Sequence, residues 1–225
     1  MTESKNVLVV AAHADDEVLG CGGTMAKHAA RGDRVDILLL ADGVTSRPNG
    51  HKDLTERNTS AEDAARILGV NPPIRLGLPD NRLDSLALLD VVQAMEAFFD
   101  KLKPEILYIH HGGDLNVDHQ VAERAVLTAA RPQPWCSVRR IYSFEVLSST
   151  GWSSSALDPG FHPTRFVDIS AQLQMKLSAL KCYEQEMRDF PHARSYQAVE
   201  ALAKYRGTSV GLEAAEAFMV VRELG

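Results

Sequence analysis

Short aliphatic and β-branched runs alternate with longer amphipathic stretches along the first two thirds of the chain, and no other feature restricts the fold as strongly. Short apolar runs bounded by turn residues predict buried strands, whereas apolar residues at every third or fourth position predict helices. Strands that alternate with helices form a parallel sheet covered by those helices. The sequence therefore predicts an α/β fold, a Rossmann-like doubly wound and mostly parallel sheet with helices on both faces.

The expected elements follow one another without an internal repeat or a linker. Strands are predicted over residues 6–12, 34–41, 74–77, 105–110 and 140–147, and helices over residues 16–31, 55–68, 85–102 and 118–130. The remaining predictions are a loop over 148–163, helices over 171–187 and 196–205, and a closing strand or helix end over 217–222. We therefore expect one domain over residues 1–225, in which the part from about residue 148 contributes loops and helices over the active face.

Charge and composition exclude several classes of function. The net charge of −6 opposes a general affinity for nucleic acid or for anionic membranes. No apolar run reaches membrane-spanning length, and the first residues lack the basic and apolar regions of a signal peptide, which favours a cytoplasmic protein. Apolar residues make up 45% of the chain, so folding needs no partner subunit, although a homo-oligomer stays open.

The cysteines are three in number and far apart, at Cys21, Cys136 and Cys182. This spacing argues against a disulfide framework and against a cysteine zinc site, and we interpret each cysteine as a small core residue. Any metal must then be held by histidine and carboxylate side chains.

The densest group of ligand-type side chains directly follows the first predicted strand. His13, Asp15, Asp16 and Glu17 place one imidazole and three carboxyl groups at the carboxyl end of that strand, where ligand crevices form in open α/β sheets. So much negative charge in a cleft is costly unless a cation neutralises it or some carboxyl groups stay protonated. Acidic residues also cap helix N-termini, but capping does not account for a histidine and three acids in one stretch.

A second group follows the strand predicted over residues 105–110 and comprises His110, His111, Asp114, Asn116, Asp118 and His119. In a doubly wound sheet the two loops can lie side by side at the switch point. That arrangement would bring together His13, Asp16 and His119, two imidazoles and one carboxylate. Three protein ligands with one open position are typical of a catalytic zinc site, here one Zn²⁺ per chain. The alternative for His119 is an exposed residue at a helix start.

These stretches resemble the motifs of the LmbE-like, or PIG-L, family of N-deacetylases. Residues 13–17, followed by Gly-Cys-Gly-Gly-Thr, are similar to the family's A-H-P-D-D-E signature, and residues 114–119 are similar to its second metal motif, which commonly ends in D-H. Arg57 and the turn that ends at Asp80 also fall in the expected order, so the resemblance extends over most of the chain.

The resemblance implies a hydrolase that removes an N-acetyl group from an amino sugar similar to N-acetylglucosamine. His13, Asp16 and His119 would then bind the zinc, and Asp15 would be the general base that takes a proton from the metal-activated water. The alternatives are a metal-dependent hydrolase of a different amide or ester, and a non-catalytic carbohydrate-binding relative. The presence of Asp15 speaks against the latter, because a binding protein needs no base.

Two positions depart from the family's pattern. Ala14 replaces the usual proline, which loosens the preset backbone without removing a functional group. Asn116 stands where many members have a second histidine, thought to stabilise the oxyanion. Either the Asn116 amide donates that hydrogen bond, or His110, His111 or His192 supplies a positive charge, and we favour a histidine. The predicted catalytic group is therefore Asp15, His110, Asn116 and Asp118, the last as a partner that orients a histidine.

Five residues are expected to bind the substrate: Arg57, Asp80, Trp152, His192 and Arg194. Arg57 and Asp80 match family positions, although a solvated helix residue and a turn residue are the alternatives. Trp152 lies in a polar loop, as a platform for a sugar face or as an anchor of a lid. His192 and Arg194 either meet an anionic part of the substrate or pin a loop through surface ion pairs.

Overall fold

Seven strands form one sheet in the computed structural model, which describes residues 3–46, 50–154 and 160–225. The strands are β1 (Asn6–Ala11), β2 (Arg34–Ala41), β3 (Ile74–Leu78), β4 (Ile106–His110), β5 (Arg140–Phe144), β6 (Arg165–Asp168) and β7 (Ala215–Glu223). Their order in the sheet is β3-β2-β1-β4-β5-β7-β6. The first five strands in this order run parallel, whereas β7 is antiparallel to both β5 and β6. The predicted mostly parallel α/β sheet is therefore confirmed.

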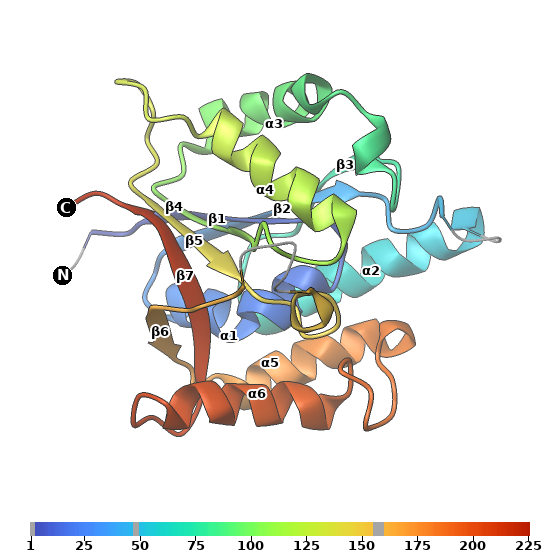
Figure 1. Ribbon diagram of the computed structural model, residues 1–225, viewed down its shortest axis with the longest axis vertical. Helices are drawn as coiled ribbons and strands as arrows, with labels where there is room; N and C mark the ends of the chain where they lie inside the picture. Colours follow the sequence, from blue (N-terminus) through green and yellow to red (C-terminus); the bar gives the residue numbers. More distant parts are fainter. Residues whose placement is uncertain (1–2, 47–49, 155–159) are drawn as a thin grey trace.

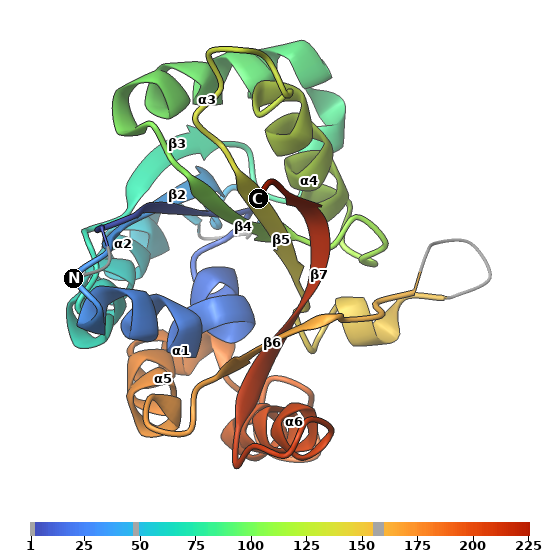
Figure 2. The same cartoon turned by 90° about the vertical axis from the view of Figure 1, so that its left-hand side faces the viewer.

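Helices cover both faces of this sheet (Figure 1). The α-helices are α1 (Asp16–Ala30), α2 (Gly50–Leu68), α3 (Leu88–Leu102), α4 (Val117–Ala129), α5 (Leu173–Leu180) and α6 (Tyr196–Thr208). The 3₁₀ helices are η1 (Leu83–Ser85), η2 (Thr150–Trp152) and η3 (Lys181–Glu186). Helices α3 and α4 lie on one face, and α1, α2, α5 and α6 lie on the other. In Figure 2, β6 and β7 extend the sheet towards α6.

Strand β1 lies inside the sheet between β2 and β4 and is buried on both faces, which explains its apolar run Val7–Ala11. Because side chains alternate along a strand, Val7 and Val9 join the core on the α1 side, whereas Leu8 and Val10 join the core beneath α3 and α4. Strand β1 pairs with β4, but α1 and α4 turn to opposite faces of the sheet. The loops after β1 and β4 therefore meet at the switch point between these strands, the place where open α/β sheets bind ligands.

Two predicted helices are interrupted. The helix predicted over residues 85–102 begins at Leu88, because Leu86 has an extended backbone (ψ 148°) that ends η1. The helix predicted over residues 171–187 consists of α5 and η3, with a non-helical Tyr183 (φ −105°, ψ 34°) inside η3. In both cases the sequence has helical spacing, but tertiary contacts determine where the backbone turns.

The other differences lie at element ends and in the C-terminal part. The strand predicted over residues 140–147 ends at Phe144, and the four-residue strand β6 was not predicted. The segment predicted over 217–222 as a strand or a helix end is the strand β7. Within the predicted loop 148–163, residues 155–159 lie outside the described part of the chain. None of the helices in the described part combines the length and the apolarity needed to cross a lipid bilayer.

Candidate metal centre and active site

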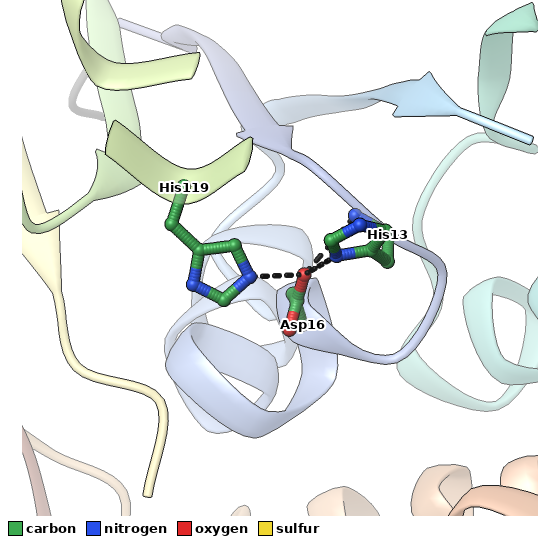
Figure 3. Close-up of side chains that lie close together, drawn as sticks. All are labelled: His13, Asp16 and His119. Carbon is green, nitrogen blue, oxygen red and sulfur yellow. Dashed lines mark hydrogen bonds and ion pairs between the residues drawn. The ribbon is translucent and has the colours of Figure 1, made fainter. Parts of the chain in front are cut away.

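The side chains of His13, Asp16 and His119 converge where the loops after β1 and β4 meet. Figure 3 shows the Asp16 carboxylate between the two imidazoles. Asp16 Oδ2 lies 3.1 Å from His13 Nδ1 and 3.1 Å from His119 Nε2. One possible ligand atom from each residue lies within 4.8 Å of the other two. The structure thus brings together the three residues predicted from the sequence as metal ligands. Two of them, Asp16 and His119, are 103 residues apart in the chain.

Each imidazole also places its other ring nitrogen on a carboxylate. His13 Nε2 lies 3.0 Å from Asp118 Oδ2, and His119 Nδ1 lies 3.2 Å from Asp114 Oδ2. Histidines that bind metals almost always donate the second ring N–H to such a partner, which sets the tautomer and orients the ring. The two carboxylates therefore leave His13 Nδ1 and His119 Nε2 to face Asp16.

The electrostatics of this cluster fit a cation. Asp15 Oδ1 and Asp16 Oδ1 are buried without a hydrogen-bond partner among the described residues, which is costly for a carboxylate. Burial lowers the pKa of both imidazoles, but their carboxylate partners outweigh it and raise the pKa of His13 to about 10 and that of His119 to about 9. A metal that replaces these protons releases them on binding. Two imidazole nitrogens and one carboxylate are a donor set that suits a divalent transition metal.

A second group of possible ligands, His13, Asp80 and Asp118, lies on the other side of the His13 ring. Both oxygens of Asp118 already accept backbone N–H groups, Oδ2 from Asn81 (2.7 Å) and Oδ1 from Leu83 (2.9 Å). Asp118 therefore ties the loop after β3 to α4 and to His13. From the sequence, Asp118 is predicted to orient a histidine, and in the structure its carboxylate contacts His13 Nε2 at 3.0 Å.

Asp15 adopts an unusual backbone conformation beside the ligand cluster. Its φ of 118° is in the region that favours glycine, and holding a non-glycine residue there costs about 1–3 kcal/mol. Its carboxylate accepts a hydrogen bond from Arg194 Nη1 (2.9 Å), and Arg194 Nε donates to Ser148 Oγ (2.8 Å). Burial raises the pKa of Asp15 to about 6, although the Arg194 guanidinium acts in the opposite direction. A carboxylate with these properties suits a general base.

Arg57 and Asp80, two expected substrate-binding residues, are bonded to protein groups. The Arg57 side chain is only 10% exposed, forms an ion pair with Glu186 and donates from Nη2 to the carbonyl oxygen of Ala14 (3.0 Å). Asp80 is buried, lies 3.3 Å from His13 Nε2 through Oδ1, and accepts a hydrogen bond from Ser46. Both residues border the cluster, and their contacts keep them in place.

Trp152, His192 and Arg194 form a group at the rim of the site. The Trp152 side chain is 55% exposed, and its ring lies edge-on to that of His192 at 5.6 Å between centroids. His192 Nδ1 accepts the backbone N–H of Arg194 (3.0 Å), whose guanidinium reaches Asp15. The exposed indole is therefore connected to the proposed base through two residues of one loop.

His110 lies against the ligand cluster, with its Nε2 3.6 Å from Asp16 Oδ2. Its ring stacks on that of His119, with centroids 3.8 Å apart, and its Nε2 accepts the backbone N–H of Ala12 (2.9 Å). Burial lowers the pKa of His110 to about 3, so the ring is neutral. His110 can support His119 by stacking, but a neutral ring does not supply the positive charge expected at the oxyanion from a histidine.

The other candidates for that role occupy different places. His111 is buried, with its ring edge-on to Phe161 at 5.4 Å. Asn116 is the N-cap of α4, where its Oδ1 accepts the backbone N–H of Asp118 (2.8 Å). This cap uses the carbonyl oxygen of the Asn116 side chain, so its amide N–H groups take no part in the cap.

Asp114 is a supporting residue for which no role was predicted from the sequence. Besides His119, its Oδ2 meets the hydroxyl groups of Thr150 (2.6 Å) and Ser149 (3.0 Å). Its place in the second motif was the one feature of the sequence that could have pointed to this role. The hydroxyl groups that hold it, those of Ser149 and Thr150, lie about 35 residues further along the chain. Only the folded chain shows that η2 and the loop before it hold the carboxylate that orients His119.

We expect Asp114→Asn to weaken metal affinity about 10- to 100-fold, the usual cost of losing a supporting carboxylate. Metal titration of the demetallated protein measures this affinity. Asp33→Asn is the matched control, because Asp33 pairs with His28 Nδ1 (2.6 Å) at the other end of α1. Equal affinities of Asp114→Asn and the control would contradict the supporting role.

Comparison with known sequences finds relatives over most of the chain. The chain is 31% identical over 183 residues to the uncharacterized deacetylase YaiS of Escherichia coli strain K12. The aligned residues cover 79% of this chain and 89% of that protein. It is 27% identical to a diacetylchitobiose deacetylase of Thermococcus kodakarensis, over 96% of this chain and 83% of that protein.

Solved structures share the fold. The conserved protein TT1542 from Thermus thermophilus has a TM-score of 0.75 at 26% identity and covers 98% of this chain and 96% of its own. N,N'-diacetylchitobiose deacetylase from Pyrococcus horikoshii has a TM-score of 0.79 at 20% identity, over 98% of this chain and 85% of its own. GalB, a 4-carboxy-2-hydroxymuconate hydratase from Pseudomonas putida, has a TM-score of 0.78 at 21% identity, over 98% of both chains. A hydratase among these neighbours means that the fold alone does not determine the reaction.

The family assignment rests on the sequence. Residues 8–130, more than half of the chain, match the family PIG-L, described as GlcNAc-PI de-N-acetylase. This span contains His13, Asp16 and His119, the three side chains that meet in the structure. The chain belongs to the PIG-L, or LmbE-like, family of deacetylases.

Proposed function

We propose that this protein is a zinc-dependent hydrolase that removes the acetyl group from the nitrogen of an N-acetylglucosamine-like amino sugar. The observation that carries the proposal is the His13, Asp16 and His119 cluster with the buried carboxylate of Asp15 beside it. Relatives add support, since a 1D-myo-inositol 2-acetamido-2-deoxy-α-D-glucopyranoside deacetylase of Mycobacteroides abscessus is 25% identical over 82% of each chain. Like diacetylchitobiose, the compound in that name carries an acetamido group on a sugar.

The proposed ligands are His13 Nδ1, Asp16 and His119 Nε2, which leave room for water or substrate at the ion. Imidazole and carboxylate donors favour zinc among the common divalent metals, although they also accept others. When bound, the ion supplies polarisation of the acetyl carbonyl and a lower pKa for the attacking water.

Asp15 is the proposed acid and base of the reaction. An amide is a poor electrophile and its amine is a poor leaving group, so both attack and departure need a proton transfer. Asp15 accepts the proton of the attacking water and then returns it to the departing amine. Arg194 holds the carboxylate in place through its 2.9 Å hydrogen bond. The Asn116 amide is the proposed side-chain donor to the oxyanion that develops on the carbonyl oxygen.

The exposed indole of Trp152 is the proposed platform for the sugar face, with His192 packed edge-on beside it. Asp80 is the proposed acceptor for a sugar hydroxyl group, next to His13. The two residues come from different segments of the chain: Asp80 follows β3, and Trp152 ends η2.

A screen of soluble N-acetylated sugars and nucleotide sugars tests the proposal. We expect release of acetate and a free amine, loss of turnover after removal of metal with a chelator, and recovery on addition of zinc. Phosphoesters and non-sugar amides belong in the same screen. Cleavage of only those compounds would favour a different metal-dependent hydrolase, and sugar binding without turnover would favour a carbohydrate-binding protein.

A further inference from the structure

We infer that two residues of η3, Tyr183 and Glu186, are positioning residues that clamp the peptide unit preceding Asp15 and so hold the base in its strained backbone conformation. The clamp is made by two chains of contacts, one to the N–H group and one to the carbonyl group of the Ala14–Asp15 peptide. The inference rests on the proposed function in one respect, namely that Asp15 is the base.

The first chain of contacts holds the N–H group. The backbone N–H of Asp15 donates to Glu17 Oε2 (3.0 Å), and the Tyr183 hydroxyl donates to Glu17 Oε1 (2.6 Å). Glu17 is 1% exposed and Tyr183 is 2% exposed, so water does not compete for these bonds. Tyr183 therefore orients the carboxylate to which the Asp15 N–H is bonded.

The second chain of contacts holds the carbonyl group of the same peptide unit. Arg57 Nη2 donates to the carbonyl oxygen of Ala14 (3.0 Å), and Arg57 Nη1 is paired with Glu186. A guanidinium group is planar, so the ion pair at one arm sets the direction of the other. Arg57 and Glu186 side chains are each only 10% exposed.

Both polar ends of one peptide plane are thus held, and the orientation of that plane sets the φ angle of Asp15. A strained conformation of this kind persists only where its surroundings over-determine it. The residue before Asp15 is an alanine, so the backbone here lacks the restriction that a proline would impose. The contacts of Glu17 and Arg57, rather than the residue type at position 14, hold the Ala14–Asp15 peptide plane.

The loop after β2 is built to admit the Arg57 arm of the clamp. Gly43 has a φ of +69°, and a Cβ atom at this position would overlap the guanidinium of Arg57. The glycine therefore meets two requirements at once, a left-handed backbone and close approach of a side chain. Because both arms of Arg57 contact protein atoms, the structure assigns it to positioning Asp15 rather than to binding substrate.

A phenylalanine substitution at Tyr183 tests the clamp, because it removes only the hydroxyl group that orients Glu17. Tyr142→Phe is the matched control: Tyr142 is also buried, and its hydroxyl donates to the carboxylate of Glu223 (3.2 Å) away from the site. We expect Tyr183→Phe to lower kcat about 10- to 100-fold, because small misplacements of a reacting group have effects of this size. KM and bound metal should stay within twofold of the wild type, as should all three values in Tyr142→Phe.

Amide hydrogen exchange over residues 12–18, followed by mass spectrometry on the metal-loaded protein, tests the clamp without substrate. We expect this segment to exchange faster in Tyr183→Phe than in the wild type and in Tyr142→Phe. If Tyr183→Phe does not fold, Glu186→Gln tests the Arg57 arm with the same measurements and the same expected direction.

The outcomes separate the clamp from the proposed function. Faster exchange with lower kcat and retained metal supports the inference. Unchanged exchange overturns the clamp, and unchanged kcat despite faster exchange overturns its role in catalysis, as does a loss of metal. If the wild type deacetylates no N-acetyl sugar, the proposed function fails, whereas the exchange data still decide whether the clamp exists.

Discussion

Asp15→Asn is expected to lower kcat for deacetylation by about 10²–10⁴-fold, the contribution usual for one general acid–base group. The amide has nearly the size and shape of the carboxylate and can still accept the hydrogen bond of Arg194 Nη1, so the loop should keep its conformation. It cannot take a proton from water. The loss should therefore appear in kcat, with one metal ion per chain retained.

Steady-state kinetics on an N-acetyl sugar and metal analysis of the same preparations measure this prediction. Asp33→Asn is the control, since Asp33 is an acidic partner of a histidine that lies away from the catalytic cluster. Turnover within tenfold of the wild type in Asp15→Asn would remove Asp15 as the base. Loss of the metal together with turnover would instead make Asp15 part of the ion's binding site.

His119→Ala is expected to reduce both bound metal and deacetylation to background. The substitution removes one of the three proposed ligands and also leaves Asp16 Oδ2 and Asp114 Oδ2 without the imidazole that lies 3.1 Å and 3.2 Å from them. Catalytic zinc sites use three protein ligands. With only two of them left, we expect the ion to dissociate during dialysis. Added zinc should restore activity only in part.

Metal content after dialysis and turnover with added zinc measure this second prediction. His28→Ala is the control, a partly buried histidine paired with Asp33 and expected to change neither value. The experiment also discriminates between the two groups of possible ligands, because His13 belongs to both but His119 belongs to only one. Full metal content in His119→Ala would therefore place the ion between His13, Asp80 and Asp118.

The C-terminal part of the chain completes the site. Tyr183, Glu186 and Arg194 contact Glu17, Arg57 and Asp15, so the surroundings of the proposed base include segments outside the residues 8–130 that match the family. Substitutions in η3 are consequently expected to act on the rate of the reaction although they lie far from the metal ligands in sequence.

The sequence by itself determined the parallel sheet and the candidate metal ligands of this protein. Strands such as β2 are buried runs whose period and bounds are visible locally, and the β2 prediction over residues 34–41 matches the structure. His13, Asp16 and His119 were predicted as ligands because histidines and acidic residues follow two predicted strands in short motifs. Both inferences use short-range patterns and one general rule about where strands end.

Only the tertiary structure decided which side chains support these residues. The break at Tyr183, the short strand β6 and the backbone strain at Asp15 arise from packing and hydrogen bonds between distant segments, so no local pattern encodes them. The bond from Tyr183 to Glu17 spans 166 residues and that from Arg194 to Asp15 spans 179. The functional state of a buried carboxylate is set by whatever surrounds it in space, and those neighbours exist only once the chain has folded.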